Sequence, residues 1–209
     1  MVFTNNSNSL SDNKVINLKK GQRINLSKDG VNLERIMVGL GWDANEFDTG
    51  GAFDLDASAF LLGDNGKVTS ENDFVFYHAP EHYSGAVKHT GDNRTGSGDG
   101  DDEQIFVDLS KVPSHISRIA FTVTIYDAAR LNQNFGMVKN SYIRLLDDTT
   151  GKELLRYDLG EDYSIETAIV FAEIYRKNGS TWAFNAVGQG FQGGLGALCG
   201  HYGIDAQSE

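Results

Sequence analysis

The chain has 209 residues and one cysteine, Cys199, which excludes a disulfide-stabilised fold and a cysteine-based zinc site. Lysine and arginine number 18 against 29 aspartates and glutamates, and the formal charge of −11 argues against nucleic acid as a partner. The longest apolar stretches fall far short of the ~18 residues that a membrane-spanning helix requires. We therefore expect no direct membrane insertion and a cytoplasmic location.

Short runs rich in Val, Ile, Phe and Tyr, separated by many of the 24 glycines, are typical of a β-protein. Residues 15–18 and 23–26 are predicted to form a hairpin around a glycine-containing loop. Further strands are predicted, in chain order, at residues 35–42, 54–62, 73–77, 104–109, 118–126, 141–147 and 154–159.

The last third of the chain predicts one more hairpin and little helix. Residues 167–176 run into Asn178 and Gly179, a pair typical of a type I′ turn, before the next apolar strand. Short helices are predicted at 128–133 and at 195–202, the second ending at Gly203. The pattern indicates an all-β sandwich of two mostly antiparallel sheets, with one domain at 15–204 between polar tails at 1–14 and 205–209.

Residues 91–103 form an acidic, glycine-rich segment, which we call the acidic loop. It holds five carboxylates and four glycines in thirteen residues, with Arg94 as the only countercharge. Such a loop is either fully solvated or ordered by a cation. Glycines let carbonyl oxygens turn inward beside the carboxylates, and a flexible oxygen cage suits Ca²⁺ better than Mg²⁺. The loop is not an EF-hand, because Arg94 and Gly96 would occupy ligand positions.

Two further carboxylates, Asp54 and Asp56, lie two residues apart at the start of an apolar strand. The period of a strand places them on one face. They could complete the coordination begun by the acidic loop, or they could cap turns and accept backbone amides.

Spacing and charge within the acidic loop predict two ions. In a locally extended chain Asp99, Asp101 and Glu103 would converge on one side, while Asp102 would point away toward a second ion and residues 92–93 would close the other end. Two Ca²⁺ need roughly 12 to 16 oxygens, more than the loop carboxylates supply. Their charge largely offsets the local excess of negative charge. We therefore expect a stoichiometry near two.

A set of longer motifs stands in fixed order along residues 15–203. They are GLGWD at 39–43, FDLDASAFLL at 53–62, DFVFY at 73–77, the acidic loop, QNFG at 133–136, RYDL at 156–159, ETA at 166–168 and AVGQG at 186–190. Together they resemble the TerD family of tellurium-resistance and stress proteins.

The resemblance implies a β-sandwich that binds two Ca²⁺. Ser97 stands where many members carry an acidic residue, so a hydroxyl, a carbonyl or a water would replace a carboxylate there. Carried over residue by residue, the implied ligands are Asp54, Asp56, Asp92, Asn93, Asp99, Asp101, Asp102 and Glu103, with carbonyls at Arg94, Gly96, Gly98 and Gly100.

The favoured hypothesis is a calcium-binding, non-enzymatic stress-response protein. The resemblance implies partners from stress and tellurite-resistance operons, which can include a membrane protein that holds the chain at the periphery of the inner membrane. Two alternatives stay open: a metal-dependent hydrolase, which needs an open metal position and a nearby base, and a lectin-like module, in which calcium coordinates sugar hydroxyls.

Overall fold

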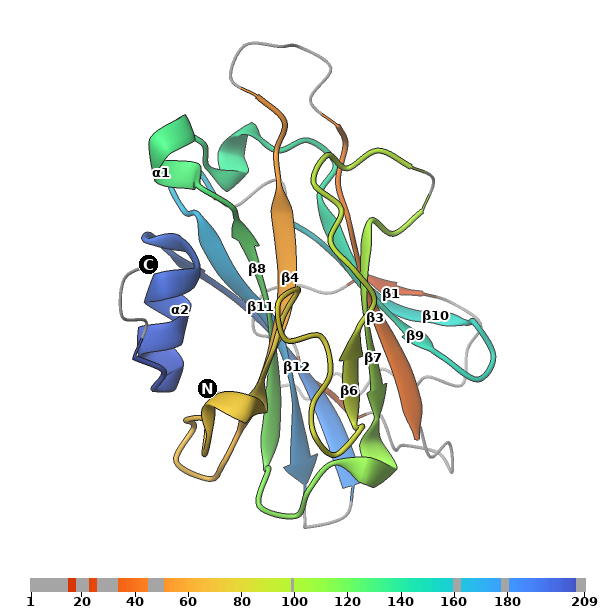
Figure 1. The fold of residues 1–209 in the computed structure, drawn as a ribbon. Coiled ribbons are helices and arrows are strands. Elements are labelled where there is room, and N and C mark those ends of the chain that lie inside the picture. Colours follow the sequence, from red (N-terminus) through yellow and green to blue (C-terminus); the bar gives the residue numbers. More distant parts are fainter. Residues whose placement is uncertain are drawn as a thin grey trace, which may run out of the picture.

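The structure, a computed structural model, describes residues 15–17, 23–25, 34–44, 51–98, 100–159, 163–177 and 181–205, with only the backbone described at 23–25 and 186. Both predicted tails lie outside this part, apart from Asp205. The predicted sandwich is confirmed, because two mostly antiparallel sheets pack face to face (Figure 1).

Each sheet contains six described strands. In spatial order, the first sheet is β1 (Ile16–Asn17), β10 (Glu153–Asp158), β9 (Tyr142–Asp147), β3 (Arg35–Gly41), β7 (Glu103–Asp108) and β6 (Val87–His89). The second sheet is β2 (Arg23–Asn25), β12 (Thr181–Phe191), β11 (Ala168–Lys177), β8 (Arg118–Ile125), β4 (Leu55–Leu62) and β5 (Phe74–Val75).

The main core lies between the sheets. Along β7, Ile105 and Val107 are buried and alternate with half-buried residues, as expected for a strand with one face inward. β4 is buried along its whole length because both of its faces are covered. Leu55 and Ala57 belong to the main core, whereas Phe60 joins a second apolar cluster on the outer face of its sheet.

Two short helices lie on that outer face (Figure 1). α2 (Gly194–Tyr202) packs Leu198 and Tyr202 into the second cluster and ends at Gly203, whose φ of 88° confirms the predicted stop. α1 (Ala128–Leu131) ends earlier than predicted, because Asn132 adopts a left-handed conformation. Short 3-10 turns occur at Glu71–Asp73, Leu109–Lys111 and Phe135–Met137. No helix in the described ranges has the length and apolar character to cross a bilayer.

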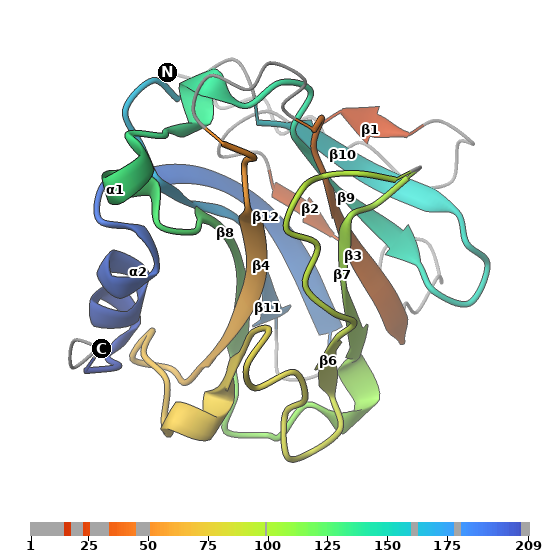
Figure 2. The same cartoon turned by 45° about the horizontal axis from the view of Figure 1, so that its top comes forward.

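The predicted hairpin near the N-terminus is wrong. β1 pairs in parallel with β10 of the first sheet, whereas β2 pairs antiparallel with β12 of the second (Figure 2). Alternating polarity is the same for two strands of one hairpin and for two separate edge strands, so the pattern could not identify the partners. The other predicted hairpin is confirmed by the antiparallel pairing of β11 with β12, although its turn at 178–180 lies outside the described residues.

The predicted strand at 73–77 is shorter in the structure, because Asp73 belongs to a capped turn. Its Oδ2 accepts hydrogen bonds from the Thr69 and Ser70 amides, at 3.0 Å each, and from the Thr69 hydroxyl. Oδ1 lies 3.1 Å from Nε2 of the buried His82. This pairing holds the segment between β4 and β6 against the sandwich.

Candidate metal centre

Three aspartates from two segments converge at one end of β4. Asp54 precedes the strand and Asp56 lies within it, while Leu55 between them faces the core, as the period of a strand predicts. The acidic loop, which connects β6 to β7, brings Asp92 to the same point. One carboxylate oxygen from each of Asp54, Asp56 and Asp92 lies within 4.8 Å of the other two. A cation between them could bind all three.

The electrostatics of this cluster disfavour three bare carboxylates. Asp56 is only 7% exposed, and burial followed by the charges of Glu103 and Asp54 raises its pKa to about 8. Burial, and next the charge of Asp92, also raises the pKa of Asp54. The positive charge of Arg94 partly opposes this increase. Oδ1 of Asp54 is buried without a hydrogen-bond partner. A divalent cation would neutralise the repulsion and give this oxygen a partner.

Glu103 adds a fourth carboxylate beside the three aspartates. Its Oε2 accepts a 2.6 Å hydrogen bond from the Ala57 amide, and its Oε1 accepts one of 3.3 Å from the Asn93 amide. Nε2 of the buried His89 lies 3.3 Å from Oε2. Because Nδ1 of His89 accepts from the Gly91 amide, we place the ring proton on Nε2, donating to Glu103. Glu103 is therefore held in one orientation next to Asp56.

Asn93 and Gly96 shape the acidic loop rather than face the aspartates. Oδ1 of Asn93 accepts hydrogen bonds from the Thr95 and Gly96 amides. Its Nδ2 donates a hydrogen bond of 2.8 Å to Oδ1 of Asp102. Gly96, at φ +65°, packs so closely on Trp42 that a Cβ would lie 2.5 Å from the indole nitrogen. Trp42 Nε1 donates to the carbonyl of Phe53, which ties the loop to the start of β4.

The expectation that Asp101 and Glu103 share a side is wrong. The chain bends at Asp102, which interrupts the alternation of an extended strand. The side chain of Asp101 is fully buried and accepts hydrogen bonds from Nε and Nη2 of Arg144, at 2.7 and 2.9 Å, and from the Tyr142 hydroxyl. It packs over Gly39, where any Cβ would collide with the carboxylate. Asp101 is thus the partner of the half-buried Arg144 guanidinium, on the opposite face from Glu103.

Asp102 and Gly98, two further predicted ligands, lie away from the three aspartates. Asp102 accepts a 3.0 Å hydrogen bond from the Trp42 amide, and burial, with the charges of Asp101 and Asp43, raises its pKa. Gly98 borders the groove described next, and Asp99 lies outside the described residues. The structure thus brings together Asp54, Asp56 and Asp92 with Glu103 beside them, and it separates Asp101 and Asp102 from them.

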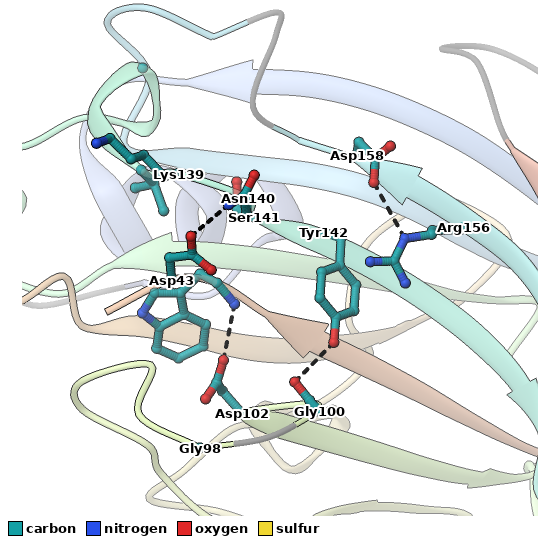
Figure 3. A pocket seen from close by; sticks show the side chains of 13 residues that line it. Asp43, Gly98, Gly100, Asp102, Lys139, Asn140, Ser141, Tyr142, Arg156 and Asp158 are labelled. Atoms are coloured by element: carbon teal, nitrogen blue, oxygen red, sulfur yellow. Dashed lines mark hydrogen bonds and ion pairs between the residues drawn. The ribbon is translucent and has the colours of Figure 1, made fainter. Parts of the chain in front are cut away.

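A polar groove of ≈ 870 Å³ lies on the other side of the acidic loop (Figure 3). Asp43 and Asp102 both line it, and Nδ2 of Asn140 donates a 2.6 Å hydrogen bond to Oδ2 of Asp43. Figure 3 marks this hydrogen bond with a dashed line. At its far end Arg156 pairs with Asp158 and stacks over the Tyr142 ring, 3.8 Å from the centroid. The carbonyl of Gly100, also at this groove, accepts from the Tyr142 hydroxyl. Asp43, Asp102 and Asp158 line this groove together with Lys139 and Arg156, so it is less acidic than the three-aspartate cluster.

Sequence reasoning missed His89 and Trp42 as parts of the centre. His89 contacts Glu103 across the antiparallel pair β6–β7, and strand 87–89 was not predicted. A lone histidine fourteen residues from its partner carries no recognisable spacing. The regular spacing of paired antiparallel strands predicts this contact between His89 and Glu103 only once the strand at 87–89 is recognised.

The comparisons with known proteins agree with this architecture. The chain is 58% identical over 189 residues to the uncharacterized protein YceE of Bacillus subtilis, and the match covers 90% of this chain and 98% of that protein. It is 51% identical over 189 residues to general stress protein 16U of the same organism, covering 90% and 97% of the two chains. It is 52% identical over 191 residues to tellurium resistance protein TerD of Serratia marcescens, covering 91% and 98%.

A solved structure supports the fold independently. The crystal structure of a homologue of telluride resistance protein (TerD) from Streptomyces coelicolor superposes with a TM-score of 0.68 at 24% identity, covering 80% of this chain and 95% of the other. The TerD domain matches residues 15–202, nearly the whole described sandwich. The chain that carries this acidic centre therefore belongs to the TerD family.

Proposed function

We propose that this protein is a non-enzymatic, calcium-binding stress-response protein of the tellurite-resistance type. The observation that carries the proposal is the convergence of Asp54, Asp56 and Asp92 within 4.8 Å, with a buried oxygen of Asp54 that lacks a partner. An acidic site made of carboxylates and a flexible glycine-rich loop favours Ca²⁺ over Mg²⁺, which requires a near-ideal octahedron.

The first ion would bind Asp54, Asp56 and Asp92, with Glu103 contributing at least its charge. A second ion would bind on the groove side of the acidic loop, at Asp102 and Asp43. The negative charges of these two carboxylates repel each other. The bent loop between the two sites would be ordered by both ions. This arrangement keeps the predicted stoichiometry near two and moves Asp101 out of the ligand set.

The non-enzymatic reading is favoured over the hydrolase for a chemical reason. Hydrolysis at a metal requires a base within reach of the metal-bound water. His89 is the histidine beside the centre, and both of its ring nitrogens are engaged, one with Glu103 and the other with the Gly91 amide. None of the relatives named above carries the name of an enzyme.

Isothermal titration calorimetry with Ca²⁺ tests the proposal. We expect a stoichiometry near two for the unmodified protein, and the loss of one site in Asp56→Asn. The loss in affinity should exceed the ~10–100-fold typical of removing an outer-shell partner, because a ligand itself is removed. Asp64→Asn is the matched control, since Asp64 is an exposed aspartate just beyond the other end of β4. Unchanged binding in Asp56→Asn would place the ligands elsewhere.

The cellular part of the proposal rests on the relatives. Because relatives are named for general stress and for tellurium resistance, we propose a role in resistance to these stresses. From the family resemblance we also propose that the protein acts with products of the same operon, a membrane protein among them. Deleting the gene should sensitise the host to tellurite, and the Asp56→Asn allele should fail to restore growth where Asp64→Asn succeeds. Equal complementation by both alleles would separate the stress function from the metal centre.

A further inference from the structure

A second groove, of ≈ 500 Å³, opens directly beside the three aspartates. Asp56 of β4 and its cross-strand partner Thr124 of β8 line it, and the starts of α1 and α2 flank it. Both helices lie on the outer face of this sheet (Figure 1). We call this the helix groove. It is distinct from the polar groove on the far side of the acidic loop.

Two polar residues that line the helix groove are largely buried: Asp56 is 7% exposed and Thr124 is 2% exposed. The buried oxygen without a hydrogen-bond partner at this centre is Oδ1 of the neighbouring Asp54, and such exceptions call for a ligand or a water. A cation would satisfy Asp54 and Asp56 from one side, and the Thr124 hydroxyl offers a hydrogen bond to an oxygen-bearing ligand in the groove.

The rim of the helix groove carries exposed apolar surface. Tyr126 is 55% exposed and Ile165 is 59% exposed, and Tyr77 also lines the groove. Tyr126 follows β8 directly, and its amide donates to the carbonyl of Asp54, so this residue lies next to the candidate metal centre. Solvent-exposed aromatic rings beside a polar floor are typical of sites that bind amphipathic small molecules.

The charge of the centre decides which kind of small molecule fits. Asp54, Asp56, Asp92 and Glu103 with the nearby Arg94 carry a net charge of −3, and one Ca²⁺ leaves −1. Asp127, also at the groove, is already paired with Arg130. A site that stays negative after binding its cation disfavours phosphates and carboxylates. It favours uncharged oxygen donors.

We propose that the helix groove binds a carbohydrate, with two vicinal hydroxyls completing the coordination of the cation and an apolar sugar face packed on Tyr126. The inference rests on the proposed function, since it needs an ion at Asp54, Asp56 and Asp92. One oxygen from each of the three aspartates converges on the site, and Ca²⁺ takes 6 to 8 oxygens, so coordination positions remain for hydroxyls. The Thr124 hydroxyl and the Gln192 amide offer uncharged hydrogen bonds to the remaining sugar oxygens.

Saturation-transfer NMR tests the proposal after calorimetry has established calcium binding. The probes are the methyl glycosides of mannose, glucose, galactose and fucose, which present vicinal hydroxyls in different relative orientations. We expect transfer from the protein to at least one glycoside in Ca²⁺ and its loss on adding EGTA. Inorganic phosphate and acetate, added as competitors, should leave the signal unchanged.

Variants separate the sugar site from the metal site. Tyr126→Ala should lose the glycoside signal and keep its calcium affinity, whereas Tyr126→Phe should keep both, because the ring is retained. Tyr83→Ala is the matched control, because Tyr83 is also an exposed tyrosine, at 66% against 55% for Tyr126, and is not among the residues lining the helix groove. Asp56→Asn should lose both calcium and glycoside.

Three results would overturn the inference. Calcium binding with no transfer to any of the four glycosides would leave the proposed function standing and remove the sugar site. Displacement of the glycoside by phosphate would show an anion site instead. Absence of calcium binding in the unmodified protein would remove the proposed function and this inference together, and calorimetry detects that case first.

Discussion

At the scale of single residues, the acidic side chains of this protein have different tasks although they look alike in the sequence. Asp101 pairs with Arg144, and this hydrogen bonding holds the pKa of the Arg144 guanidinium above its ordinary value. Asp54, Asp56 and Asp92 face one another instead. The difference arises from the bend at Asp102, which turns Asp101 toward the outer face of its sheet.

Asp101→Asn distinguishes these tasks. Asparagine keeps one acceptor oxygen and loses the charge that Arg144 faces, so we expect a loss of about 1.5–3 kcal/mol in the free energy of unfolding. Calcium affinity at the three aspartates should stay within experimental error. Denaturant unfolding in chelator and calcium calorimetry measure the two quantities. A fall in affinity equal to that of Asp56→Asn would show that Asp101 is a ligand, as the spacing in the sequence suggested.

Asp73 gives a prediction with a definite pH dependence. Burial would raise its pKa, but hydrogen bonds from Thr69 and His82 outweigh burial and hold the pKa below the ordinary 3.8. Because the folded-state pKa is depressed, this carboxylate stabilises the fold above pH ~4 and loses its contribution as the pH falls through the folded value.

Asp73→Asn should therefore cost about 2–4 kcal/mol at neutral pH, because asparagine keeps one acceptor oxygen, loses the charge and places an NH₂ donor against buried hydrogen-bond donors. The difference in unfolding free energy between the variant and the unmodified protein should shrink in acid. Urea unfolding at pH 7 and pH 3 measures both numbers. A difference that is constant across this range would mean that charge on Asp73 does not contribute.

At the scale of elements, the sequence predicted most strands and missed how two of them pair. Runs such as 118–126 carry enough β-branched and aromatic residues to be recognised, and β8 covers nearly the same residues. The three-residue strand β6 is too short to stand out, and β1 and β2 are recognisable as strands but not as members of different sheets. Pairing depends on distant residues, which periodicity does not report.

The same limit applies to the candidate centre. Asp54 and Asp56 were predicted to share a face, and the structure places them together with Asp92. The prediction for Asp54 and Asp56 was correct because side chains along a strand alternate between its two faces. The acidic loop has none, since glycines such as Gly96 adopt positive φ and turn the chain unpredictably. Side-chain directions at 101–103 therefore could not be derived from spacing.

Gly96→Ala tests how far the acidic loop depends on its contact with Trp42. Both Gly96 and Gly85 have positive φ, so either substitution costs about 1–2 kcal/mol of backbone strain. Only at Gly96 would the new Cβ also collide with Trp42, whereas at Gly85 it would meet open space. We expect Gly96→Ala to weaken calcium binding and Gly85→Ala to leave it unchanged.

Calorimetry on the two glycine variants, after circular dichroism has confirmed that both are folded, gives the comparison. Equal calcium affinities would show that the loop adjusts to the added methyl group and that the Trp42 contact does not position the centre. A larger loss of thermal stability in Gly96→Ala than in Gly85→Ala is expected in either case.

At the scale of the whole molecule, calcium should act as a stabiliser of the folded state. An ion that binds only the folded protein raises the free energy of unfolding by about 2.7 kcal/mol when its concentration is a hundred times its Kd. The melting temperature should therefore rise with calcium concentration and return on chelation. Magnesium at the same concentration should have a smaller effect. Coincident melting curves in calcium and in chelator would show that the acidic loop is a solvated turn.

The separation of β1 and β2 has a consequence for how the protein is made. These strands leave the ribosome first, yet Ile16 pairs with Leu155 and Ile24 with Phe184, which are synthesised much later. At typical translation rates the wait is on the order of ten seconds. In the described residues β1 and β2 each close one edge of a sheet, and neither strand has its partner until the last third of the chain emerges. Nascent chains arrested before β10 would therefore expose β1 and β2 as unpaired strands to chaperones and to other nascent chains.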